Sequence, residues 1–422
     1  MFATKLPFVL AIACTAGAAQ AQTARDVIDG YADLALAKYS DSLTAAEALD
    51  AAIDAFVAAP GEDTHAAAKD AWRAARVPYQ QTEAYRFGNA VVDDWEGKVN
   101  AWPLDEGLID YVDTGYYGEE NEENALFRAN VIANASLSVG GQTVDASNIT
   151  PALLQELHEI DGVEANVATG YHAIEFLLWG QDTNGTNAGA GARTWTDFAA
   201  GDDCTGGNCD RRAAYLTAAS DLLLMDLKDI VAAWGDGGAA RTDLDGKSDA
   251  EGLSAILTGL GSLSYGELAG ERMKLGLILH DPEEEHDCFA DNTHNSHYYD
   301  VLGMQNVYLG TYTATDGSVV SVPSLASLAE GVDAGLNAEM SSNLDATMTA
   351  MGVIKARADS GVEAYDQMIG YGNDEGNAIV QAAIDALVTQ TRSIEKLVAA
   401  LNASDIAVEG SDSLDNPTAV FE

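Results

Sequence analysis

Apolar residues recur along most of the chain at intervals of three and four, the spacing of one face of an α-helix. A clear run contains Leu36, Tyr39, Leu43, Ala46 and Leu49. The predicted helices cover residues 24–40, 44–59, 63–87, 103–112, 122–134, 151–159, 163–179, 211–234, 247–259, 265–277, 296–308, 323–352, 360–369 and 374–402. The pattern therefore predicts a protein that is almost entirely helical.

Two short segments break this pattern, because β-prone residues alternate there on either side of glycine. They are residues 137–144 and 312–320. Each is followed by a proline, Pro151 or Pro323, in the place where a helix accepts proline as its first residue. We predict two small β-hairpins, each leading into a helix.

The predicted hairpins occupy similar places in the two halves of the chain. The segment 105–111 precedes the first and the segment 297–300 precedes the second, and a shared order of elements indicates an internal repeat. We therefore expect an all-α fold of two related helical bundles in tandem, with small β-hairpin insertions. The expected units are a signal peptide at 1–21, an N-terminal bundle at 22–200, a C-terminal bundle at 201–402 and an acidic tail at 403–422.

The first residues have the pattern of a cleavable secretory signal. One positive charge precedes an apolar run at 8–13, and small residues at 19–21 place the expected cleavage before Gln22. The alternative is a lipid anchor on Cys14, although the residue three positions upstream is alanine rather than the usual leucine. No later stretch has the roughly 18 apolar residues that a membrane span needs. We expect an exported protein, periplasmic or associated with the outer membrane, that does not span the membrane.

The chain is strongly acidic, with a formal net charge of −46 at pH 7. Loss of Lys5 with the signal makes the mature chain one unit more negative. Such a charge repels nucleic acid and anionic lipid headgroups, and it attracts cations or basic peptides. Solubility in a salty medium is the alternative explanation. The charge therefore argues against nucleic acid as a partner and leaves a cation-gathering role open.

Three cysteines remain after the signal: Cys204, Cys209 and Cys288. In an oxidising compartment Cys204 and Cys209 are the natural disulfide, because Gly206 and Gly207 let the short loop between them close. Cys288 is then left over. It is either a buried small hydrophobic residue or a reactive or ligating thiol.

The segment from Gly170 to Glu175 carries the sharpest candidate chemistry. His172 and Glu175 are three residues apart, so on a helix they project from one face. Ile174 and residues 176–179 are apolar, so this helix is buried and its two polar side chains need partners. Metal coordination satisfies both, and Gly170 allows another backbone or a ligand to come close. The alternative is a local hydrogen bond that completes a buried polar pair.

A second polar group surrounds Pro78, which we expect to kink or interrupt its helix. Arg76, Glu83 and Arg86 recur there at helical spacing. They are candidates to complete a site, and a salt bridge among them is the alternative.

A third polar segment, 280–297, holds four of the seven histidines together with several acids and Cys288. This mixture is typical of a transition-metal site, and a solvated acidic loop is the alternative. The zinc-helix motif His-Glu-x-x-His is absent, so a zinc site needs a distant third histidine: His286, His294 or His297. The sequence also lacks a nucleophile elbow, a phosphate-binding glycine loop and a haem-attachment motif.

Together with their neighbours, these residues resemble the imelysin family, also called the insulin-cleaving or iron-regulated-protein-A family. The resembling segments are 78–88, 102–106, 170–180, 204–212, 285–294 and 409–417. The resemblance implies two related helical bundles, export to the bacterial envelope and a link to iron acquisition. It also implies that Gly170, His172 and Glu175 form the Gly-x-His-x-x-Glu active site of the family, to which a peptidase label is attached.

We therefore expect one cleft between the bundles that binds iron, as a bare ion or a chelate, with an envelope iron-uptake protein as partner. The residues expected to hold the metal are His172, Glu175, Glu83 and Asp105; those expected to contact the ligand are Gly170, Arg76, Arg86, His286, Asp287 and His294. The alternatives are a zinc-dependent peptidase that uses the same His/Glu pair, and a structural envelope scaffold.

Overall fold

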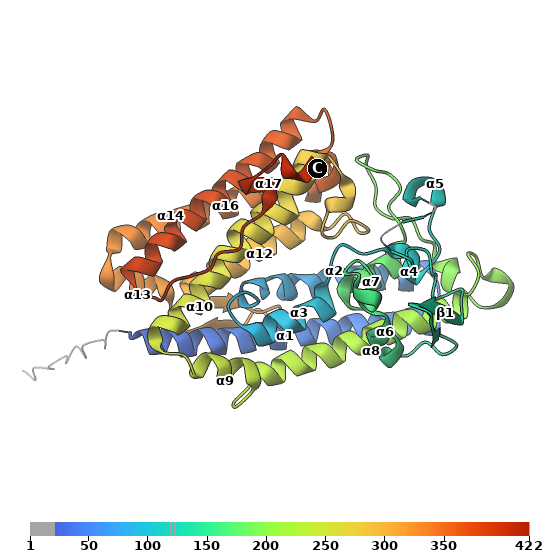
Figure 1. Cartoon of the computed structure of the whole chain (residues 1–422), viewed down its shortest axis with the longest axis horizontal. Helices are drawn as coiled ribbons and strands as arrows, with labels where there is room; N and C mark the ends of the chain where they lie inside the picture. Colours follow the sequence, from blue (N-terminus) through green and yellow to red (C-terminus); the bar gives the residue numbers. More distant parts are fainter. Residues whose placement is uncertain (1–21, 119, 122–123, 422) are drawn as a thin grey trace, which may run out of the picture.

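The computed structural model describes residues 22–118, 120–121 and 124–421, and the predicted signal peptide with Cys14 lies outside them. This part of the chain is mostly helical, with two small antiparallel two-stranded sheets (Figure 1). The prediction of an all-α fold with hairpin insertions is confirmed. Within the same residues, every helix is too short or too polar to cross a membrane.

The elements up to residue 245 form the first part of the fold. They are α1 (Ala24–Ala58), α2 (Glu62–Gln80), η1 (Glu83–Tyr85), α3 (Ala90–Asn100), α4 (Glu106–Ile109), α5 (Thr114–Tyr117), β1 (Ser136–Val139), β2 (Gln142–Asp145), α6 (Pro151–Leu157), η2 (Ile160–Gly162), α7 (Gly170–Trp179), η3 (Trp195–Phe198), η4 (Gly201–Asp203), α8 (Cys209–Trp234) and α9 (Ala239–Asp245).

The remaining elements follow from residue 249. They are α10 (Asp249–Ser262), η5 (Leu263–Leu275), α11 (Gly276–Leu279), η6 (Pro282–Glu284), α12 (Thr293–Leu309), β3 (Thr311–Thr313), β4 (Val319–Ser321), α13 (Leu325–Val332), α14 (Ala334–Asp359), α15 (Tyr365–Ile369), α16 (Asp374–Ala400), α17 (Asp412–Asp415) and η7 (Ala419–Phe421).

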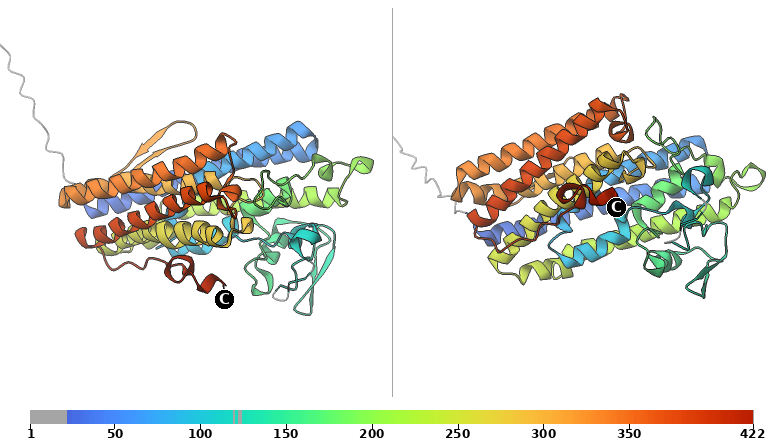
Figure 2. Two further views of the ribbon diagram at one scale, coloured as in Figure 1. Left: turned by 90° about the horizontal axis from the view of Figure 1, so that it is seen from above. Right: turned by 45° about the horizontal axis from the view of Figure 1, so that its top comes forward.

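Two groups of long helices lie side by side (Figures 1 and 2). In one, α1 packs against α2 and α8; in the other, α14 packs against α16 and α12. The groups meet where α1 contacts α10 and where α2 contacts α12. One buried hydrophobic cluster contains side chains from both groups. The domain boundary at 200/201 and the duplication stay predictions.

α1 runs unbroken through the place where the sequence predicts a gap between two helices. The hydroxyl groups of Ser40, Ser42 and Thr44 donate hydrogen bonds to carbonyl oxygens four residues earlier in α1. These polar side chains bond to their own helix instead of ending it. The predicted break at 41–43 is therefore wrong.

The predicted helices at 103–112 and 122–134 are also wrong, apart from the single turn of α4. Backbone N–H groups of residues 130–132 donate to the carbonyl oxygens of residues 107–109. The Arg211 guanidinium donates to further carbonyl oxygens of the second segment. Because these backbone groups bond across the fold, they are not available for helices of their own.

Both predicted hairpins are present, with β1 paired to β2 and β3 paired to β4. Pro151 is at the start of α6, as predicted. Pro323 is not the first residue of α13, because Ser324 follows it as the N-cap and accepts the N–H of Ser327. The predicted helix 323–352 is divided at Asp333, whose carboxylate caps the start of α14.

α10, η5 and α11 form one continuous rod, in which η5 is a π-helix. The wider π turn is rare, and where it does occur it is often part of a functional site. Residues 403–421, which we call the C-terminal strap, run along this rod (Figure 1). The strap bonds to it through Ser404 and Ser413. A Cβ added at Gly266 would lie 2.6 Å from the Glu409 carbonyl oxygen, so the strap lies directly on the η5 backbone.

Candidate metal centre

α7 carries His172 and Glu175, and Gly170 fixes where this helix begins. Gly170 has a φ of 78°, in the left-handed region that favours glycine. A Cβ added there would lie 2.5 Å from the carbonyl carbon of Val99 in α3. The predicted helix 163–179 is therefore wrong for residues 163–169, because the chain must turn at Gly170. From that point on, every residue of α7 is buried.

His172 and Glu175 form a hydrogen-bonded pair within α7. His172 Nδ1 lies 3.0 Å from Glu175 Oε2, and Glu175 Oε1 accepts the backbone N–H of Ala290 at 2.9 Å. His172 Nε2 is buried and has no hydrogen-bond partner in the described part of the chain. Both oxygens of Glu175 are thus engaged, while one ring nitrogen of His172 stays available to a ligand.

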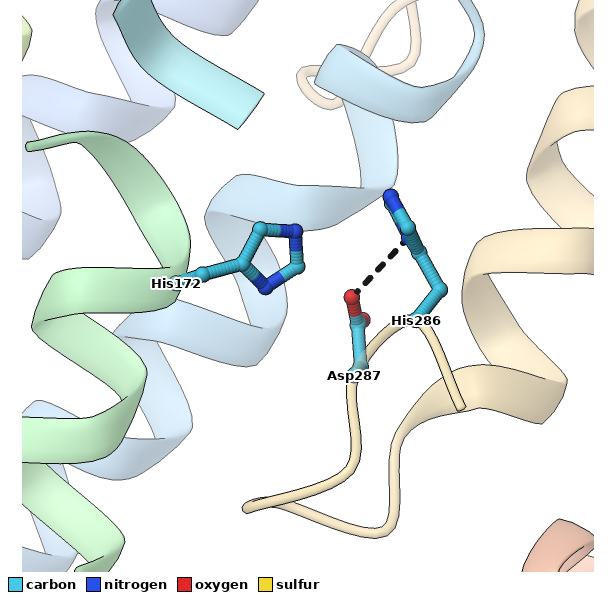
Figure 3. Close-up of side chains that lie close together, drawn as sticks. All are labelled: His172, His286 and Asp287. Carbon is cyan, nitrogen blue, oxygen red and sulfur yellow. Dashed lines mark ion pairs between the residues drawn. The ribbon is translucent and has the colours of Figure 1, made fainter. Parts of the chain in front are cut away.

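His286 and Asp287, from the segment between α11 and α12, lie next to His172 (Figure 3). The two imidazole rings meet edge to face, with centroids 4.7 Å apart. His172, His286 and Asp287 each bring one donor atom within 4.8 Å of the other two. We call these three residues the metal centre, because two imidazoles and a carboxylate so close together suit a transition-metal ion.

Arg76 from α2 compensates the charge of Asp287. Its Nη2 donates to Asp287 Oδ1 at 2.7 Å, and its Nη1 donates to Asn100 Oδ1 at 2.6 Å. The guanidinium lies within 5.6 Å of three ring centroids, those of Trp72, Tyr79 and Tyr171. Because both Arg76 and Asp287 are almost fully buried, each depends on the other for a counter-charge.

The second carboxylate oxygen of Asp287 is held by the start of α12. Asp287 Oδ2 accepts from Asn292 Nδ2 at 2.8 Å and from the Ser296 hydroxyl. The backbone N–H of Asp287 donates to Thr293 Oγ1 at 2.9 Å. Asp287 is therefore fixed from both sides, by α2 and by α12.

Burial and neighbouring charges set the protonation of these groups. Burial and Arg76 lower the pKa of His172 to about 3, and burial also lowers the pKa of His286 well below its usual value. Burial opposes ionisation of Asp287, but the Arg76 guanidinium holds its pKa well below the usual range. Burial raises the pKa of Glu175 well above its usual value. At neutral pH the imidazoles are thus uncharged, as metal ligands must be.

A pocket of about 420 Å³ opens beside the metal centre, with His286, Asn100 and Trp102 in its wall. Its charged lining residues are Glu96, Glu159, Glu164, Glu267, Glu271, Arg86 and Arg272. Five carboxylates against two guanidinium groups give the pocket a negative potential, which favours a cation.

Arg272, from η5, organises the polar wall of this pocket. It donates to Glu83 Oε2 at 2.7 Å, to Glu267 Oε1 at 2.8 Å and to Asp300 Oδ2 at 3.2 Å. Arg86 contacts Glu267 as well. Glu83 and Arg86 therefore belong to the network around Arg272 and do not pair with Arg76.

Two of the predicted site residues lie apart from the three donors. Asp105 accepts a hydrogen bond from Asn124 and lines a different pocket. His294 Nε2 lies 3.3 Å from Asp359. His172, His286, Asp287, Glu175 and Arg76 are the predicted residues that the structure brings together.

The cysteines pair as predicted. Cys204 and Cys209 form a disulfide, which confirms that pairing. Cys288 is free and packs against the hydrophobic core. Burial raises the pKa of its thiol well above the usual value, so Cys288 is a protonated thiol at neutral pH.

Arg272, Asp300 and Asn100 are parts of the site that the sequence reasoning missed. The signal available for Arg272 was a basic residue inside a stretch rich in glycine and leucine. Such a residue, once buried, requires carboxylate partners. Asn100 carried no comparable signal, because its role follows from the place where α3 ends beside Arg76.

Comparison with known proteins adds three findings. The family model described as imelysin matches residues 35–394. Iron-regulated protein A of Synechococcus elongatus is 33% identical over 94 residues, which spans 22% of this chain and only 26% of that protein. A crystal structure of a Parabacteroides distasonis protein, named as an iron-regulated protein A precursor, has a TM-score of 0.62 at 18% identity and covers 91% of this chain and 97% of its own. The structural match shows a common fold.

Proposed function

Because this chain belongs to the imelysin family, we propose that it is an exported protein of the bacterial envelope that binds iron during iron uptake. Two similar proteins are named as iron-regulated, and one of those names includes the word precursor. Both names support control by iron supply, and the word precursor in the second supports a role outside the cytoplasm. The ligand is iron itself, taken as an ion or from a small chelate.

The cluster of three donor atoms carries this proposal. His172, His286 and Asp287 meet within 4.8 Å, and His172 Nε2 is buried without a partner among the described residues. Leaving such an atom unpaired costs about 1–3 kcal/mol, and a metal ion would remove that cost. Imidazole with carboxylate is a donor set that suits iron.

Glu175 has a positioning role in this proposal rather than the role of a direct ligand. Its Oε2 faces His172 Nδ1 at 3.0 Å, and its Oε1 is held by Ala290. When a carboxylate accepts the Nδ1 proton of a histidine, it turns Nε2 toward the metal and strengthens it as a ligand. The proposed metal ligands therefore differ from those expected from the sequence, because His286 and Asp287 take the place of Glu175, Glu83 and Asp105 beside His172.

The same geometry favours binding over peptide hydrolysis. A zinc peptidase needs a base that takes a proton from the attacking water. Glu175 contacts His172 Nδ1, on the opposite side of the ring from the free Nε2 that would face the metal, so it is not placed to take a proton from a metal-bound water. The pocket of about 420 Å³, with five carboxylates in its lining, leads a cation to His286.

Iron titration of the purified chain, freed of metal beforehand, tests the proposal. We expect one iron per chain, lost in His172→Gln and in His286→Gln but retained in His280→Gln. His280 is the matched control, because it is a partly buried histidine that bonds the Ile369 carbonyl instead of facing the metal centre. Circular dichroism shows whether each variant is folded.

Three outcomes would overturn the proposal. Full iron binding by the double variant His172→Ala/Glu175→Ala would show that these residues do not form the iron site. Peptide cleavage that stops with a chelator and returns with zinc would favour the peptidase. Variants that only lower the melting temperature, with no iron bound by the unaltered chain, would leave a structural role.

A further inference from the structure

A smaller cavity is lined in part by the same segment that supplies the metal centre, through Glu285, Cys288 and Phe289. Its volume is about 10 Å³, close to the space of a single water molecule. Four carboxylate residues line it, namely Asp182, Glu283, Glu285 and Asp366, together with Tyr116, Gly185, Pro282, Cys288 and Phe289. We call it the carboxylate cavity. Its acids come from three places: the segment after α7, the segment around η6, and α15.

Two of these carboxylates are buried, and some of their oxygens lack a hydrogen-bond partner among the described residues. Glu285 is 1% exposed and Asp366 is 2% exposed. Glu285 Oε1 and both side-chain oxygens of Asp366 have no hydrogen-bond partner in the residues that the structure describes. A buried ionised carboxylate without a partner is strongly unfavourable, so each of these acids either keeps its proton or gains a counter-charge.

The lining supplies no such counter-charge, since none of the nine lining residues is basic. Asp291, outside the lining, adds a further negative charge nearby. Burial and then the charge of Asp291 raise the pKa of Asp366 to about 7, and burial and then Asp182 raise the pKa of Asp291 to about 7. The acids, when ionised, therefore repel one another around a space that fits a single water molecule or ion.

We infer that the carboxylate cavity is a second cation site, distinct from the metal centre, and that it takes a hard divalent cation, Ca²⁺. Its charged donors are carboxylate oxygens without imidazole, which is the donor chemistry of Ca²⁺, and the Cys288 thiol in the lining stays protonated at neutral pH and is a poor ligand. Ca²⁺ also accepts irregular geometry from separate segments, whereas Mg²⁺ demands a near-ideal octahedron.

Binding at this site draws its segments together. Among the described residues, no three of these carboxylates bring one oxygen each within 4.8 Å of the others. Ca²⁺ holds its oxygens at about 2.3–2.6 Å, so the ion pulls α15 and the segment around Glu285 toward each other. Ca²⁺ therefore stabilises the folded chain, by a free energy that grows with the logarithm of one plus the ratio of its concentration to the dissociation constant.

Calorimetric titration of the whole mature chain with CaCl₂, after removal of metal, tests this inference. At physiological ionic strength, which screens diffuse binding to the acidic surface, we expect one saturable site. Asp366→Asn should weaken it by about tenfold or more, because it removes one charged ligand. Asp94→Asn, the same change at an exposed residue of α3, should leave it unaltered. Asp366→Asn should also keep its iron binding, which separates this site from the metal centre.

A second variant covers the case in which Asp366→Asn does not fold. Asp291 has a φ of 50°, a conformation that asparagine tolerates well, so Asp291→Asn should fold and bind Ca²⁺ more weakly. The absence of a saturable Ca²⁺ site in the unaltered chain would overturn the inference. Equal Ca²⁺ affinity in the unaltered chain and in a folded Asp366→Asn variant, or tighter binding of MgCl₂ than of CaCl₂, would overturn it as well.

Discussion

The metal centre and the carboxylate cavity are neighbours, but the buried carboxylate of the first has a charged partner and those of the second have none in the described part of the chain. Glu285 and His286 are adjacent in sequence, yet Glu285 lines the cavity and His286 belongs to the metal centre. In the metal centre, Asp287 has Arg76 as a permanent partner. In the carboxylate cavity, Glu285 and Asp366 have oxygens without a partner among the described residues.

This difference separates a preformed site from one that its ligand completes. The metal centre keeps its geometry through bonds from α2 and α12 to Asp287. In the carboxylate cavity, no side chain of the described residues bonds to Asp366 in this way, so the geometry of the cavity depends on what occupies it. Substitutions in the metal centre should therefore lower the free energy of unfolding. Substitutions of the acids in the cavity should raise it when no cation is present.

The largest expected effect is that of Arg76→Met. It leaves Asp287 buried without a counter-charge, and breaking a buried pair in this way costs about 3–5 kcal/mol of unfolding free energy. Arg73→Met in the same helix is the matched control, because its pair with Asp70 is exposed and should be worth at most about 1 kcal/mol. Urea denaturation of both variants measures the difference. Equal losses would mean that Arg76 does not have this role.

A similar loss is expected where α7 meets α3. Gly170→Ala places a Cβ 2.5 Å from the Val99 carbonyl carbon, so we expect a loss of roughly 3 kcal/mol, from left-handed strain and backbone displacement together. Gly141→Ala isolates the strain, because Gly141 also has a positive φ, 82°, but has open space around it. It should cost roughly 1 kcal/mol. If thermal melting gives both variants the same loss, the contact with Val99 does not fix α7.

A buried histidine outside both sites should make stability depend on pH. His65 stacks on Phe56, and its Nε2 lies 2.7 Å from the Leu178 carbonyl oxygen. Burial, followed by the charge of Lys69, lowers its pKa from 6.5 to about 4. Between these values the unfolded chain binds more protons than the folded one, so stability is complete above pH 6.5 and falls as the pH drops toward 4. The full shift corresponds to about 3 kcal/mol.

His65→Gln should flatten this dependence. Melting temperatures of the variant and the unaltered chain, measured between pH 7 and 4, give the comparison. The melting temperature of the variant should be lower at pH 7 and should fall less as the pH drops to 4. Parallel curves would show that His65 does not titrate in this range.

The smallest expected effect is a gain in stability. Without Ca²⁺ at a pH of about 8, Asp366→Asn removes one of the repelling charges of the carboxylate cavity, so unfolding should cost roughly 1–2 kcal/mol more. Asp94→Asn should change it by less than about 0.5 kcal/mol. With saturating Ca²⁺ this gain should be cancelled, because the ion stabilises the unaltered chain by about 1.4 kcal/mol more than a variant that binds it about tenfold more weakly. Urea denaturation of the two variants with and without CaCl₂ gives all of these values.

Helical periodicity predicted the long packed helices well, since α8 and α16 each bury a mainly apolar face. It failed where backbone groups bond across the fold. Residues 107–109 and 130–132 lie in segments with helix-like spacing of apolar residues, yet the carbonyl oxygens of the first accept the N–H groups of the second. A local pattern does not contain that information, because the partner lies in a distant segment.

The predicted site shows the same limit. Spacing within α7 predicted that His172 and Glu175 share a face, and the histidine-rich segment pointed to His286 and Asp287. Composition did not distinguish His286 from His294, although the first meets His172 and the second meets Asp359. That choice depends on where α12 begins and on which side of it each residue falls.

The C-terminal strap has a consequence for how this chain is made. The residues that cover the glycine face of η5 are synthesised long after η5 itself. Until the strap is synthesised, η5 therefore stays uncovered on this face. The pocket wall that contains Arg272 is covered from behind only when the strap packs on η5. The pocket wall can therefore form in full only after the last residues of the chain have been synthesised.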